Sequence, residues 1–155
     1  MFTSINESTW EHMKLFVVSA FLTTVFYLVP YEGFAGEGLF FSAIAAAISA
    51  MVIPLLYYGY RMFFKYPVMM FDIAIYFLAS LVFKIAYEHI VSWRLPIPIM
   101  SIAMFGILLW SIIWIILSYW TYSPPKNSLF KCPQTGIYGH PQPVKKRKRA
   151  KTHIV

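Results

Sequence analysis

Four long apolar stretches dominate this sequence. A helix needs about 20 mostly apolar residues to cross about 30 Å of hydrocarbon, and the stretches at residues 15–31, 39–60, 69–91 and 97–122 qualify. Of the 155 residues 59% are hydrophobic and 12% charged, whereas soluble domains average about 45–50% apolar and about 25% charged. Short connections favour antiparallel neighbours. The sequence therefore predicts an all-α membrane protein, an up-down bundle of four transmembrane helices.

Basic residues predict the orientation, because cytoplasmic loops carry an excess of Lys and Arg. With the N-terminus inside, eleven of the thirteen basic residues lie on the cytoplasmic side: Lys14, Arg61, Lys65, Lys126, Lys131 and six in the range 145–151. Only Arg94 lies on the far side, and Lys84 lies within the third stretch. We therefore expect a multi-pass protein of the inner (plasma) membrane with both termini cytoplasmic.

The first stretch has a second interpretation, a cleaved signal peptide, which would begin with basic residues and end at small ones. Here the beginning is acidic, with Glu7 and Glu11, and bulky residues occupy positions 26–28. We therefore expect a retained span. The predicted organisation is a cytoplasmic segment over residues 1–14, a transmembrane domain over 15–122 and a cytoplasmic tail over 123–155.

The tail differs in composition from the spans, since it carries prolines, glycines and a run of like charge. The basic residues of this run are Lys145, Lys146, Arg147, Lys148, Arg149 and Lys151. Blocks of like charge repel one another and stay disordered, and each basic residue near anionic lipid is worth about 1 kcal/mol. We expect a disordered tail that binds anionic headgroups. The alternatives for this run are a nuclear-localisation-type signal, contact with RNA or DNA, and partner docking. The positive charge is confined to one short run, which excludes a soluble nucleic-acid-binding domain, so lipid rather than nucleic acid is the expected partner.

Small residues in the second stretch predict a helix-packing ridge. Helices associate in lipid by close backbone approach, which small side chains allow. Residues of this kind recur every four positions in two parallel rows, Ser42, Ala46 and Ala50 beside Ala43 and Ala47. We expect Gly106 to let the fourth helix approach this ridge.

Four ionisable residues lie in the third stretch, where charge is costly and suggests function. They are Asp72, Lys84, Glu88 and His89. Lys84 and Glu88 are four residues apart, so they share one helix face, and Lys84 lies roughly 12 Å from the external end at about 1.5 Å per residue. One interpretation is a snorkelling lysine paired at the interface. The other is a polar site, facing the bundle or a partner, that responds to something arriving from outside.

Catalytic and metal-binding patterns are missing from the sequence. It contains no HExxH, GxSxG or glycine-rich phosphate loop, and Cys132 with His140 falls short of the three or four ligands that zinc needs. We expect no enzymatic activity, no cofactor and no metal. Trp110 and Trp114 share a face in mid-span, for which we expect helix packing or lipid contact, with ligand stacking as the alternative.

One short element in the tail resembles a known pattern. Residues 132–138 read Cys-Pro-Gln-Thr-Gly-Ile-Tyr, which is similar to a Cys-Pro-x-Thr/Ser-Gly-x-aromatic element of small multi-spanning bacterial inner-membrane proteins of immunity and exclusion. The matching positions are Cys132, Pro133, Thr135, Gly136 and Tyr138. The same residues also fit a simple Pro-x-x-Gly turn. The resemblance implies a protective function.

Our leading hypothesis is a non-enzymatic protector that acts by helix–helix or loop contacts. It would give immunity to a pore-forming toxin or exclude incoming phage or plasmid DNA, and its partner would be the membrane-embedded toxin or DNA-transfer component. The alternative is a structural or assembly subunit of a larger membrane complex. A small transporter or channel comes third, and a homo-oligomer is compatible with each of the three.

Overall fold

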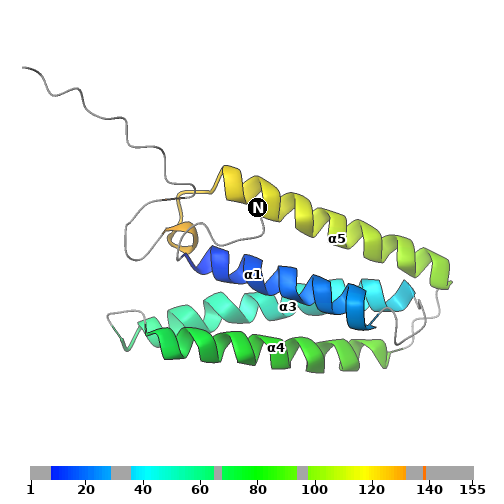
Figure 1. Cartoon of the computed structure of the whole chain (residues 1–155), viewed down its shortest axis with the longest axis horizontal. Helices are drawn as coiled ribbons and strands as arrows, with labels where there is room; N and C mark the ends of the chain where they lie inside the picture. The colour runs from blue at the N-terminus through cyan, green and yellow to red at the C-terminus, as the bar shows by residue number, and fades with distance from the viewer. Residues whose placement is uncertain (1–7, 29–35, 65–67, 94–97, 132–137, 139–155) are drawn as a thin grey trace, which may run out of the picture.

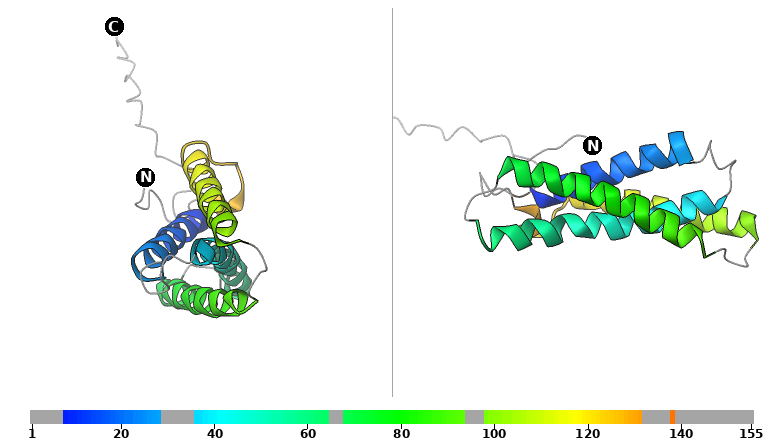
Figure 2. Two further views of the ribbon diagram at one scale, coloured as in Figure 1. Left: turned by 90° about the vertical axis from the view of Figure 1, so that its right-hand side faces the viewer. Right: turned by 90° about the horizontal axis from the view of Figure 1, so that it is seen from below.

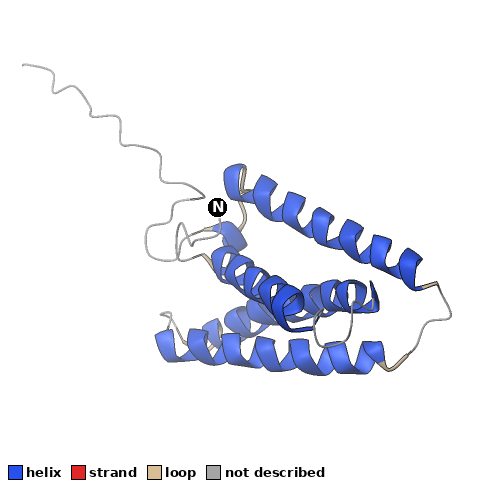
Figure 3. Cartoon of the chain, turned by 45° about the vertical axis from the view of Figure 1, so that its right-hand side comes forward, coloured by secondary structure: helices blue, strands red, loops and turns tan. Residues whose placement is uncertain are grey.

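A computed structural model describes residues 8–28, 36–64, 68–93, 98–131 and 138 of the chain. These residues form four long helices in up-down order, and each helix reverses the direction of the one before it (Figure 1). The elements are α1 (Thr9–Thr23) with the π-helical turn η1 (Thr24–Leu28), α3 (Gly36–Arg61), α4 (Met69–Val91), α5 (Ile99–Tyr122) and the 3₁₀ turn η2 (Ser128–Phe130). The described part contains no strand (Figure 3). The predicted all-α bundle is confirmed.

All four helices are long and apolar enough to cross a membrane, as expected of a multi-pass membrane protein. The α4 helix coincides with the third predicted span, and the second and fourth spans begin and end within three residues of their predicted bounds. The first span differs, because its helix begins at Thr9, six residues before the predicted start at Leu15.

The early start of α1 has a local cause. Ser8 adopts the extended conformation of an N-cap, and its hydroxyl accepts a hydrogen bond from the backbone N–H of Glu11 at 3.4 Å. Such a cap satisfies one of the free N–H groups at a helix start. Trp10, Glu11 and Lys14 are then buried in the bundle. The helix of the first span therefore includes residues 9–14, which the sequence had placed before the span.

The α3 helix lies at the centre of the bundle and packs against each of the other three (Figure 2). Its contact with α5 depends on Gly106, because a Cβ there would lie 2.6 Å from the backbone nitrogen of Phe40. Glycine thus permits the close backbone approach on which helix association in lipid depends.

An ordered segment follows α5, where the sequence predicted a disordered tail. The ring of Phe130 in η2 lies 4.9 Å from that of Trp10 and 5.8 Å from that of Trp120. These contacts join the start of α1 to the end of α5. The polybasic run at 145–151 lies outside the described residues.

Candidate functional site

A cavity of about 490 Å³ lies between the α1–η1 segment and α4. Its volume falls within the roughly 300–1,000 Å³ that ligand sites occupy. Its lining mixes aromatic, hydroxyl and charged side chains: Phe16, Ser19, Ala20, Thr23, Tyr27 and Leu28 from α1 and η1, and Tyr76, Ser80, Phe83, Lys84, Tyr87 and Glu88 from α4. We call this space the α1–α4 cavity.

The inner end of the cavity is closed where α1 and α4 touch. The hydroxyls of Ser19 and Tyr76 are hydrogen-bonded at 2.7 Å. The ring of Phe16 meets the rings of Tyr76 and Phe83 edge-on, at centroid distances of 5.8 and 6.4 Å. Beyond these contacts the two helices draw apart toward the ends that carry Leu28 and Val91, as the right-hand view of Figure 2 shows. The cavity is the space that this divergence leaves.

Two threonine hydroxyls bond to the backbone where α1 passes into the π-helical turn η1. The hydroxyls of Thr23 and Thr24 donate to the carbonyl oxygens of Ser19 and Ala20, four residues earlier, at 2.9 and 2.8 Å. Bonds of this kind compete for backbone carbonyls and often bend helices. Single π-helical turns are frequent at functional sites, and here Tyr27 from this turn lines the cavity.

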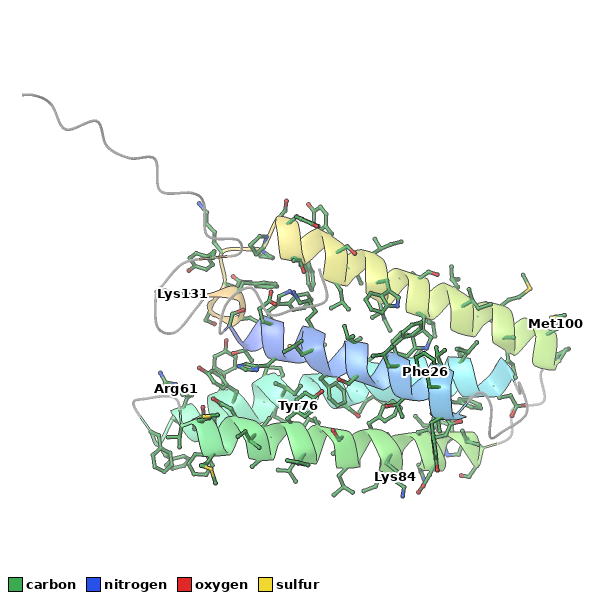
Figure 4. All side chains as sticks on the ribbon, in the orientation of Figure 1. Phe26, Arg61, Tyr76, Lys84, Met100 and Lys131 are labelled. Atoms are coloured by element: carbon green, nitrogen blue, oxygen red, sulfur yellow. The ribbon has the colours of Figure 1, made fainter. Side chains whose placement is uncertain are left out.

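Lys84 and Glu88 stand at the rim of the cavity. Their Nζ and Oε1 atoms lie 3.9 Å apart, and the side chains are 72% and 64% exposed. Figure 4 shows Lys84 directed away from the bundle, whereas Tyr76 lies between α4 and α1. The separation exceeds the 2.7–3.2 Å of an N–H···O hydrogen bond, so the pair is loose and each charge keeps bonding capacity for a ligand.

The other two predicted ionisable residues do not join this site. His89 is exposed, and its ring meets that of Trp93 edge-on, at a centroid distance of 5.9 Å. Asp72 lies twelve residues before Lys84, about 18 Å along the helix, and accepts a hydrogen bond of 2.7 Å from the hydroxyl of Tyr60.

The predicted packing ridge is mostly buried. Four of its five members in α3 are buried, Ser42, Ala43, Ala46 and Ala50, while Ala47 is exposed. Trp110 is buried against it, since the indole N–H donates to the hydroxyl of Ser42 at 3.3 Å. The ring of Phe21 contacts both Trp110 and Trp114, at 5.0 and 5.3 Å. The structure thus places this tryptophan pair in helix packing.

Sequence reasoning missed a buried ion pair in α1. Lys14 Nζ lies 2.6 Å from Glu11 Oε2, and the side chains are only 2% and 5% exposed. Glu11 is the only charged partner of Lys14 among the residues that the structure describes. Part of the signal was present, because Ser8 with Glu11 forms the S-x-x-E pattern that marks a helix start. The burial of the pair depends on how the helices pack, which this pattern does not predict.

Two further expectations concern metals and the tail element. Within the described ranges, no group of three or more His, Cys, Asp or Glu residues is placed to hold a metal ion. Of the tail element, Tyr138 pairs with Lys131 in an isolated antiparallel bridge. Cys132, Pro133, Thr135 and Gly136 lie outside the described residues.

Comparison with known proteins gives a family and no activity. Residues 1–140 match the model of a family described as "Family of unknown function (DUF6512)". The match covers most of the chain, so the chain belongs to this family. No curated protein and no solved structure matches it.

Proposed function

We propose that this chain is a non-enzymatic protein of the inner membrane that protects the cell by contacts made within the bilayer. Its partner is a membrane-embedded toxin or a component that brings in phage or plasmid DNA. The observation that carries the proposal is the exposed Lys84–Glu88 pair at the rim of the α1–α4 cavity.

The exposure of this pair is unusual for a membrane span. Ionisable groups in hydrocarbon are costly and normally face the bundle interior or a water-filled space. The α4 span, which carries the pair, is also covered least by the other helices, since only 17% of its most apolar stretch is buried within the bundle. A polar partner at this face would relieve the cost of the charges, which supports a binding role.

Charge distribution supports the direction from which the partner arrives. The ends of α3 and α5 lie at one end of the bundle. Basic residues that favour the cytoplasm are found there, since Arg61 ends α3 and Lys126 and Lys131 follow α5. Lys84 lies toward the other end (Figure 4), and Glu88 follows it by four residues in α4. By the excess of positive charge in cytoplasmic segments, the cavity faces outward, where toxins and incoming DNA arrive.

The test is a protection assay in a sensitive bacterium. Cells that express the chain are challenged with a panel of pore-forming toxins, phages and conjugating plasmids, and survival is compared with that of cells expressing Lys84→Met. We expect protection against at least one agent, lost in Lys84→Met and kept in the control Glu37→Gln, whose residue does not line the cavity. Equal killing with and without the chain across the panel would overturn the proposal.

A second candidate, a structural or assembly subunit, is favoured by the lipid-facing surface of α5. Large apolar side chains are exposed along that helix, among them Met104, Ile115 and Tyr119. A neighbouring subunit would cover them. Purification from native membranes under mild detergent distinguishes the two candidates, because an assembly subunit elutes in a larger complex and a free protector does not.

A further inference from the structure

The α1–α4 cavity is amphipathic. Phe16, Phe83 and Leu28 supply apolar surface, and the hydroxyls of Ser80 and Tyr27 lie beside it. In the described part its walls come from two neighbouring spans at the periphery of the bundle. One span is formed by α1 with η1, and the other is α4. A space between two spans is bordered by lipid, so the molecule that enters it must itself be amphipathic.

The rim specifies the charge of that molecule. Lys84 offers three N–H donors and Glu88 two acceptor oxygens, and at 3.9 Å the two side chains satisfy each other poorly. A head with an anionic and a cationic group side by side complements both charges at once. A head with an anionic group alone would meet Lys84 but be repelled by Glu88.

We propose that the α1–α4 cavity binds one molecule of a zwitterionic phospholipid, whose head carries an ammonium group next to its phosphate. The phosphate lies at Lys84, the ammonium at Glu88, and an acyl chain lies against Phe16 and Phe83. This inference goes beyond the protective role, because it concerns what the purified protein holds when no toxin or phage component is present.

The experiment is native mass spectrometry of the purified full chain, mixed with equal amounts of phosphatidylethanolamine and phosphatidylglycerol of identical acyl chains. We expect one phosphatidylethanolamine per chain, retained at least tenfold over phosphatidylglycerol. Lys84→Met removes the phosphate contact and should abolish retention. Glu88→Gln should remove the preference, so that both lipids bind alike. Both residues are exposed, so circular dichroism should show an unchanged helix content.

A matched pair of variants separates the cavity from its charged rim. Ser80 and Ser111 are both exposed, and each hydroxyl donates to the carbonyl four residues earlier, but only Ser80 lines the cavity. Ser80→Phe should fill the cavity and abolish retention, while Ser111→Phe should leave it unchanged. Equal retention of the two lipids by the native chain, or retention unaffected by Ser80→Phe, would overturn the inference. So would displacement of the lipid by soluble phosphoethanolamine, which would make the ligand a free zwitterion.

Discussion

At the scale of single residues, Gly106 sets how closely α5 approaches α3. A Cβ at this position would lie 2.6 Å from the backbone nitrogen of Phe40, which real side chains do not tolerate. We therefore expect Gly106→Ala to destabilise the bundle by about 1–3 kcal/mol, the usual cost of overpacking. Thermal unfolding in detergent measures the effect.

The control for this substitution is Gly59 in α3. A Cβ there would meet nothing within 4 Å, and alanine in a helix is worth about 0.5–1 kcal/mol over glycine. Gly59→Ala should therefore keep or raise the unfolding temperature. If both variants behaved alike, the contact between α3 and α5 would not be as close as the structure has it.

The fold also depends on the buried ion pair between Glu11 and Lys14. Removing one member of a buried pair leaves an uncompensated charge, at a cost of about 3–5 kcal/mol. We expect Glu11→Gln to be destabilising by that amount, and the double variant with Lys14→Met to recover much of the loss. The exposed Glu88 is the comparison, since Glu88→Gln should cost less than about 1 kcal/mol. Additive losses in the double variant would argue against a coupled pair.

At the scale of elements, the small-residue ridge of α3 offers a test within one helix turn. Ala46 is fully buried, while its neighbour Ala47 is exposed. Ala46→Leu should separate the helices and lower stability by about 1–3 kcal/mol, whereas Ala47→Leu should be tolerated, because its side chain meets lipid. Unfolding of the two variants in detergent measures the difference. A reversed order would mean that the other face of α3 packs in the bundle.

The helices were predictable from sequence because apolar length alone determines whether a segment can span the bilayer. The start of α1 was missed because Glu11 and Lys14 lower the local hydropathy, although the cap at Ser8 marks the boundary. The spacing of Lys84 and Glu88 was enough to predict that they share one helix face. The cavity behind them was not, because it arises where α1 and α4 diverge beyond the Ser19–Tyr76 contact, and this divergence is a property of packing rather than of local sequence.

At the scale of the whole molecule, the up-down order places the start of α1 and the end of α5 at the same end of the bundle. The excess of basic residues near that side predicts that it is cytoplasmic. Reporter fusions at both termini should therefore read cytoplasmic, and a fusion at Gly36 should read external. An external reading at the C-terminus would reverse the orientation and place the α1–α4 cavity on the cytoplasmic side.

The central claim is that Lys84 borders a polar site reachable from outside the cell, rather than lying against the hydrocarbon core of the bilayer. Labelling with a membrane-impermeant thiol reagent tests it in intact cells. We predict that Lys84→Cys and Glu37→Cys, both made in a Cys132→Ser chain, are labelled from outside. The native chain, whose only cysteine is Cys132, should be labelled only after permeabilisation. Labelling at position 37 but not at 84 would show that Lys84 faces hydrocarbon, and would contradict the account.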